Sequence, residues 1–225
     1  MSVAVLAEPI APPTHERVYQ SLRTMILFGD LRPGHAVTLL GIAEQLGVSI
    51  TPVREAVRRL IAENALQFHG NRRISVPDMD QARLEELYDA RLLLEPDLAA
   101  KAVSSSNESL ADRLTEIDAL VDEAITDGDI AAYLKQNYRF HFEIYEASNS
   151  VVFLPIVASL WLQVGPFLSV VCGRMGTSNL ADHHKSAIDA IRRGDERQLR
   201  DAVKRDLSQG LDQLRSELRD VEAND

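Results

Sequence analysis

The chain has few residues of the kinds that form covalent cross-links or catalytic centres. Cys172 is its only cysteine among 225 residues, which excludes an intramolecular disulfide and fits a reducing cytoplasm. This cysteine ends an apolar segment, where inert packing is expected rather than reactivity. No glycine-rich phosphate loop follows a strand-like segment, and no serine, cysteine or histidine recurs at nucleophile spacing. The sequence therefore argues against catalysis.

The chain also lacks the features of a secreted protein. Its first thirteen residues have neither the basic start nor the long apolar core of a signal peptide, so we expect residues 1–13 to form a flexible arm and the chain to stay in the cytoplasm. Residues 151–172 contain no charged residue, but two prolines, a glycine and Gln163 interrupt them. We expect a central helix of a bundle there rather than a membrane span.

Lysine is missing from the first third of the chain. Residues 1–77 contain eight arginines and six acidic residues, a net charge of +2, whereas residues 78–225 carry −12, which gives the formal total of −10. A basic face on the first part can bind phosphates despite the acidic total. With 45% hydrophobic and 26% charged residues, the chain is globular and suits two modest domains or one large one.

The first part contains a predicted helix-turn-helix. One short helix has apolar residues at three- and four-residue spacing, namely Leu39, Ile42, Ala43 and Leu46. Gly47 can form a left-handed C-cap, Ser49 or Thr51 can cap the next helix, and Pro52 fits its first turn. The second helix has an apolar stripe of Val53, Ala56, Val57, Leu60 and Ile61. Its arginines point elsewhere, either into a major groove or, in an ordinary helical hairpin, into solvent.

Two short alternating segments follow this helix. Residues 66–68 and 74–76 predict two strands around the sequence HGNRR. Such a basic hairpin is typical of a wing that reaches DNA through His69, Arg72 and Arg73. A tight surface turn that happens to be basic is the other interpretation.

Residues 78–225 have helical periodicity and no further strand pattern. We expect six helices, at about residues 81–103, 107–127, 129–147, 150–172, 177–193 and 195–222. Together with a first helix over residues 14–28, this predicts a mainly α protein in which a winged helix-turn-helix (residues 14–77) precedes an all-helical bundle (residues 78–225).

Several polar residues lie on the apolar stripes of these helices. They are Arg91 and Glu95 in the first, Asn137 and His141 in the third, His184 in the fifth and Asp206 in the sixth. Because buried charges are costly unless they are paired or bind metal, these residues predict one shared polar cavity. Two histidines, an amide oxygen and a carboxylate form a plausible ligand set for a divalent transition metal.

Each of these residues also has a purely structural interpretation. An inward histidine is more often hydrogen-bonded in a core than bound to metal, Arg91 and Glu95 can simply pair, and Asp206 can cap a neighbouring helix. The cavity could also be empty or bind an acid directly. A metal with four ligands could activate water, so a metal-dependent hydrolase is the rival function, alongside a helical scaffold or adaptor.

The motif LGVSITPVREAVRRL at residues 46–60, with LRPG at residues 31–34, resembles the DNA-binding motif of the GntR family of bacterial repressors. The resemblance implies operator contacts by the residues Ser49, Thr51, Arg54, Arg58, Arg59, His69, Arg72 and Arg73. Two departures matter. Ile50 stands where the family most often has an arginine, which removes an expected contact, and Arg73 stands where a glycine is common.

The second part resembles the FCD domain of the FadR-type branch through YDARLLLEPDLAA, NYRFHFEIYEASN and HHKSAIDAIRRGD. Carried over residue by residue, the metal ligands of that branch fall on Asn137, His141, His184 and Asp206. Asn137 replaces the usual aspartate and Asp206 replaces a histidine. The expected effector contacts are Arg91, Glu95 and Asn149.

The sequence thus predicts a transcriptional regulator, expected to be a repressor that a small organic acid releases from its operator. The resemblance implies a cytoplasmic homodimer on a pseudo-palindromic double-stranded DNA site. It also implies zinc, nickel or manganese in the helical cavity and no membrane partner.

Overall fold

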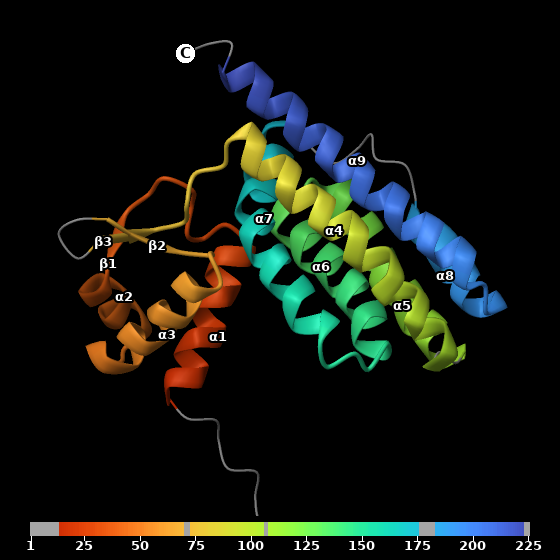
Figure 1. Cartoon of the computed structure of the whole chain (residues 1–225), viewed down its shortest axis with the longest axis horizontal. Helices are drawn as coiled ribbons and strands as arrows, with labels where there is room; N and C mark the ends of the chain where they lie inside the picture. Colours follow the sequence, from red (N-terminus) through yellow and green to blue (C-terminus); the bar gives the residue numbers. More distant parts are fainter. Residues whose placement is uncertain (1–13, 70–72, 106–107, 176–182, 223–225) are drawn as a thin grey trace, which may run out of the picture.

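The computed structural model describes residues 14–69, 73–105, 108–175 and 183–222 (Figure 1). The described chain consists of a small N-terminal head with three helices and a three-stranded sheet, and a larger bundle of helices. This is the mainly α architecture that the sequence predicts. The predicted arm over residues 1–13 lies outside the described residues.

The head contains α1 (Thr14–Leu27), β1 (Val37–Thr38), α2 (Leu39–Leu46), α3 (Ile50–Ala62), β2 (Gln67–His69) and β3 (Arg73–Ser75). The strands are antiparallel in the order β1-β3-β2, with Phe68 opposite Ile74 and Val37 on the other side of Ile74. The two wing strands are confirmed within one residue. The sequence did not predict β1, because two residues are too few to show an alternating pattern.

The turn between α2 and α3 has the predicted caps. Gly47 has a φ of 63° and donates its N–H to the carbonyls of Ala43 and Glu44, a left-handed end that favours glycine. Ser49, rather than Thr51, is the extended N-cap residue of α3. Thr38 is the N-cap of α2, and its hydroxyl accepts a hydrogen bond from the N–H of Gly41 at 3.0 Å.

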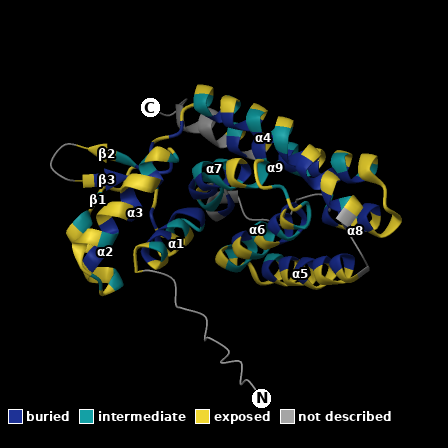
Figure 2. Ribbon diagram, turned by 60° about the horizontal axis from the view of Figure 1, so that its bottom comes forward, coloured by how far each residue is buried: buried dark blue, intermediate teal, exposed yellow. Residues whose placement is uncertain are grey.

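The bundle contains the six predicted helices: α4 (Gln81–Ala102), α5 (Glu108–Asp127), α6 (Ile130–Ala147), α7 (Phe153–Met175), α8 (His183–Arg193) and α9 (Glu196–Glu222). A short 3₁₀ turn, η1 (Val103–Ser105), follows α4. Helices α4 and α9 lie along each other and are antiparallel, since Arg215 pairs with Glu85 and Arg200 with Asp97. Figure 2 shows exposed outer faces and buried inner faces on α4 and α5.

Helix α7 connects the head to the bundle. It contacts α1 on one side and α4, α6 and α9 on the other (Figure 1). Its segment Phe153–Val170 is long and apolar enough to cross a membrane by length and composition, and 33% of it is buried in the structure. These contacts place α7 between the head and the bundle rather than at the bundle's centre, where the sequence predicts it.

At one point, the contact between α7 and the head is made backbone to backbone. A Cβ atom at Gly165 would lie 2.7 Å from the carbonyl oxygen of Leu27, and one at Gly29 would lie 2.3 Å from the hydroxyl of Ser169. Hydrogen bonds flank this contact: Ser159 donates to the carbonyl of Glu63 at 3.2 Å, and Arg83 of α4 donates to the carbonyl of Asn64 at 3.1 Å. The head is therefore seated directly on α7.

Candidate DNA-binding face and effector cavity

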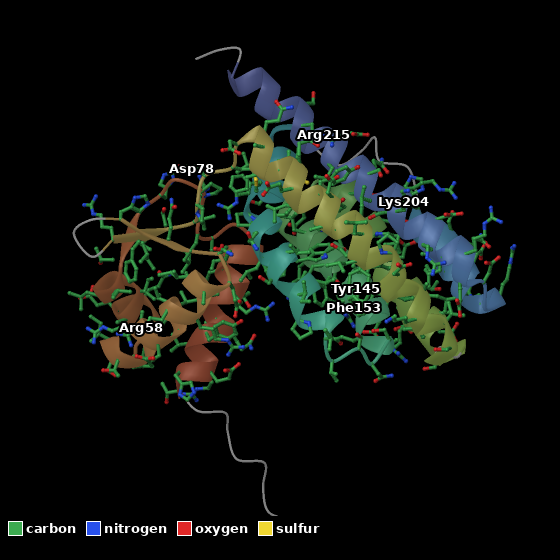
Figure 3. The ribbon with its side chains drawn as sticks, in the orientation of Figure 1. Arg58, Asp78, Tyr145, Phe153, Lys204 and Arg215 are labelled. Atoms are coloured by element: carbon green, nitrogen blue, oxygen red, sulfur yellow. The ribbon has the colours of Figure 1, made fainter. Side chains whose placement is uncertain are left out.

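Helix α3 has one buried and one exposed face. Val53, Ala56, Val57 and Leu60 are buried in the head, whereas Arg54 and Arg58 are exposed. Ser49 and Thr51 lie exposed at the N-terminal end of the same helix, beside Ile50. Figure 3 shows Arg58 on the head, well away from Tyr145 in the bundle. The exposed face of α3 is available to a major groove.

Arg59 differs from these arginines. Its guanidinium lies 3.6 Å from the centre of the Tyr19 ring and forms ion pairs with Glu16 at 3.0 Å and Glu63 at 3.3 Å. The Tyr19 hydroxyl also donates to Glu63 at 2.7 Å. The resemblance implies an operator contact for Arg59, whereas these contacts support a role in packing between α1 and α3.

The wing presents two of its three predicted DNA contacts. His69 and Arg73 are exposed and face each other across β2 and β3. The Nε2 atom of His69 lies 2.6 Å from the Ser75 hydroxyl, which holds the imidazole on the sheet. Arg72 lies outside the described residues.

The bundle encloses a cavity of about 260 Å³ between α4, α5, α6, α7, α8 and α9. Five of the polar residues singled out in the sequence line it: Arg91, Asn137, His141, His184 and Asp206. The helical period brings them together although they come from four different helices. Glu95 and Asn149 are not among the lining residues.

Three of these residues have the geometry of a metal site. His141, His184 and Asp206 each offer one ligand atom, and these atoms lie within 4.8 Å of one another. The Asp206 carboxylate is 3.0 Å from Nε2 of His141 and 3.8 Å from Nε2 of His184. Ligands at roughly 2.0–2.2 Å from a divalent ion are separated by comparable distances, so the residues fit such an ion. Asn137 lies one helical turn before His141 and can add an amide oxygen.

Hydrogen bonds orient both histidines. The Tyr145 hydroxyl donates to Glu95 at 2.7 Å, so its oxygen accepts from Nδ1 of His141 at 3.2 Å. Nδ1 of His184 lies 2.9 Å from the carboxylate of Asp118 on α5. Because Nδ1 of each ring faces its own partner, both Nε2 atoms face Asp206. This is the arrangement in which a second group fixes the tautomer of a metal-binding histidine.

Arg91 and Glu95 form a buried ion pair beside the cavity. Glu95 accepts hydrogen bonds from Arg91, from Tyr145 and from the indole N–H of Trp161 at 2.9 Å. Arg91 also lies over the Trp161 ring, with 4.4 Å to the ring centre. Burial opposes the charge on Arg91, but the adjacent Glu95 carboxylate raises the pKa of the guanidinium. Glu95 therefore holds Arg91 charged at the cavity wall and does not reach the cavity itself.

Two further groups in the cavity have shifted acidities. Burial alone would raise the pKa of Asp206, but the hydrogen bond from His141 and the nearby His184 lower it to about 2, so Asp206 is a carboxylate at neutral pH. Burial raises the pKa of the Cys172 thiol to about 11. Cys172 is therefore a neutral lining group, as its predicted inert packing requires.

The placement of Asn149 corrects one prediction. Asn149 was expected to contact the effector, but it is exposed in the turn after α6. Its backbone is left-handed, with a φ of 53°, and its side-chain amide donates to the carbonyl of Ala147 at 3.2 Å. The turn that ends α6 turns the side chain away from the cavity.

The sequence reasoning missed Asp118. This residue is buried and lines the cavity. It lies one turn after Leu114 and just before Val121 on the inward stripe of α5, so the criterion that found His141 could have found it. His183, directly before His184, also lines the cavity.

Two protein-family models match the chain in sequence order. The model of the bacterial regulatory proteins of the gntR family matches residues 14–76, and the FCD domain model matches residues 86–209. The chain belongs to the GntR family. Its FCD domain is the helical bundle that holds the cavity, and its GntR domain is the winged head.

Relatives of this GntR protein are transcriptional regulators. The chain is 31% identical to the HTH-type transcriptional regulator McbR of Escherichia coli over 74% of this chain and 76% of McbR. It is 25% identical to the gluconate operon transcriptional repressor of Bacillus subtilis over 92% and 86% of the two chains. The solved structure of E. coli McbR/YncC superposes with a TM-score of 0.86 at 27% identity, covering 92% of this chain and 99% of McbR.

These matches decide the class of function. The chain is a DNA-binding transcriptional regulator, and the related proteins are regulators rather than enzymes. They give no support to the alternative of a metal-dependent hydrolase.

Proposed function

We propose that this GntR protein is a cytoplasmic, homodimeric repressor that binds a pseudo-palindromic operator through α3 and the wing. A small organic acid bound to a divalent transition metal in the FCD cavity releases it. The observation that carries the proposal is the convergence of His141, His184 and Asp206, with ligand atoms within 4.8 Å, in a cavity that Arg91 also lines. The repressor class is supported by the relatives whose names describe repressors.

The charges around the cavity favour an acid only when the metal is bound. Arg91 and Glu95 cancel each other, which leaves the two carboxylates of Asp118 and Asp206 beside His141 and His184. A carboxylate entering this environment would be repelled. Zinc, nickel or manganese with a charge of +2 would neutralise the two carboxylates and polarise an acid bound to it. Acid binding should therefore depend on metal.

A second head is needed because one recognition helix reads only one half-site. A twofold symmetric dimer presents two copies of α3 about one helical turn of DNA apart, roughly 34–36 Å. An acid that changes the distance between the two heads would lower operator affinity by a coupling free energy.

The test uses an operator selected from random DNA and a panel of acids from acetate to octanoate, with gluconate. Fluorescence anisotropy measures operator affinity for the metal-loaded and the chelated protein. We expect at least one acid to weaken operator binding tenfold or more in the metal-loaded protein only. Operator affinity that no acid changes, or that acids change equally without metal, would contradict the proposal.

A further inference from the structure

The cavity is charged at one end and apolar at the other. We propose that its apolar end is a subsite for the hydrocarbon part of the effector, formed by Leu168 of α7 with Leu211 and Leu214 of α9. The effector would then be a monocarboxylic acid with about seven carbons beyond its carboxylate, either a medium-length chain or an aromatic ring. This inference rests on the proposed function, in which the metal end holds the carboxylate.

The helices that line the cavity define its long direction. On α9, Leu214 follows Asp206 by eight residues, a rise of about 12 Å along the helix. On α7, Leu168 follows Trp161 by seven residues, and the ring of Trp161 lies 5.2 Å from that of His141. Both helices thus lead from the charged residues to the leucines, so the two groups line opposite ends of one cavity.

The leucines belong to a separate apolar cluster. Leu211 and Leu214 are buried with Leu84, Leu87 and Tyr88 of α4, and Leu168 packs against that cluster. The ionisable lining residues lie outside it, namely Arg91, Asp118, Asp122, His141, His183, His184 and Asp206. A hydroxyl group placed among these leucines would lose its hydrogen bonds to water. The apolar end therefore favours hydrocarbon over polyhydroxy acids.

Gly210 leaves room between the two ends. It lines the cavity one turn after Asp206 and one turn before Leu214. Among the described residues, a Cβ atom added there would have no other atom within 4 Å, so the described part of the chain leaves open space over this part of α9. Glycine inside a helix costs about 1 kcal/mol relative to alanine, so the residue does not serve the stability of the helix.

The volume of this partly open cavity sets the scale of the ligand. A dry cavity of about 150 Å³ binds benzene, which has six non-hydrogen atoms. By the same ratio, the cavity of about 260 Å³ has room for roughly ten non-hydrogen atoms. A carboxylate uses three of them and leaves about seven carbons. Octanoate and phenylacetate are acids of this size.

The test is calorimetric titration of the metal-loaded protein with acetate, butyrate, hexanoate, octanoate, phenylacetate and gluconate. Each added methylene that leaves water should raise affinity about fourfold, from about 0.8 kcal/mol per methylene. The rise should continue to octanoate, and gluconate should bind no better than acetate. This series uses the parent protein, so it does not depend on the folding of a variant.

The variant Gly210→Leu fills the open space without removing any polar group. We expect it to retain its metal and its acetate affinity but to bind octanoate at least tenfold more weakly than the parent. The control is Lys204→Leu, which places a leucine at an exposed position of α9 (Figure 3). This variant should bind octanoate as the parent does.

Three results would overturn the subsite: an affinity that does not change with chain length, gluconate binding as tightly as octanoate, or equal losses of acetate and octanoate in Gly210→Leu. If acetate still binds and releases the operator in such a case, only the subsite is wrong. If no acid of any length binds the metal-loaded protein, the proposed acid response fails as well.

Discussion

The head and the bundle use charged residues in opposite ways. In the head, Arg54 and Arg58 are exposed, as side chains that contact DNA must be. In the bundle, Arg91 and Glu95 are buried and depend on each other in the folded chain. The comparison teaches that burial, rather than residue type, decides whether a charge contributes to binding or to stability.

The largest effect should come from Glu95. Glu95→Ala leaves the buried Arg91 without its partner and also removes the acceptor of Tyr145 and Trp161. We expect the free energy of unfolding to fall by about 3–5 kcal/mol, as measured by chemical denaturation. Glu86→Ala, at an exposed position of the same helix, is the control and should change it by less than about 0.5 kcal/mol. Equal losses of unfolding free energy in Glu95→Ala and Glu86→Ala would show that burial does not decide the cost of removing a charge.

The metal should give the next largest effect. An ion at about a hundred times its dissociation constant stabilises the folded chain by about 2.7 kcal/mol, which corresponds to a rise in Tm of roughly 5–10 °C for a chain of this size. Chelation should therefore lower the Tm of the parent by that amount. It should leave unchanged the Tm of the double variant His141→Ala, His184→Ala, whose site lacks both imidazoles. A parent that takes up no zinc, nickel or manganese would refute the site.

Arg54 tests whether an exposed charge of the head contributes to DNA binding rather than to stability. Arg54→Ala should reduce the preference for the selected operator over scrambled DNA by about 1–3 kcal/mol, with an unchanged Tm. Arg58→Ala is the matched control on the same helix face and should weaken both DNAs to a similar degree. Anisotropy titrations at one fixed salt concentration measure both preferences. If Arg54→Ala kept the full preference, the face assigned to DNA would be wrong.

The smallest effect is expected for an exposed pair in the bundle. Arg113 of α5 donates to Glu143 of α6 at 2.6 Å, but half of the Arg113 side chain is exposed. Arg113→Ala should lower the free energy of unfolding by less than about 1 kcal/mol. This variant tests burial within the same domain. If it lost as much unfolding free energy as Glu95→Ala, the position of a charge in the bundle, and not its burial, would decide the loss.

The sequence predicted the helices and most of the cavity because both follow from helical periodicity. His141, His184 and Asp206 interrupt apolar stripes, so their inward direction could be read directly. Asp118 interrupts a stripe in the same way and was overlooked. Asn149 was expected from a motif rather than from a stripe, and the turn after α6 directs it outward.

Other features depend on tertiary structure and leave no periodic signal. The strand β1 has two residues and forms only because β3 lies beside it. The open space over Gly210 is bounded by side chains from other helices, which no local pattern describes. The approach of Leu27 to Gly165 likewise joins residues that are far apart in the chain.

That approach has a mechanical consequence. Where two helices touch through long side chains, a change of rotamer can absorb a small displacement; where backbone meets backbone, nothing compliant lies between them. A shift of α7 at the cavity, where Trp161 and Leu168 face the ligand space, would be passed to the end of α1 almost undamped. If the head moves as one body about Gly165, a small rotation of α7 there would produce a displacement that grows with distance toward the exposed face of α3.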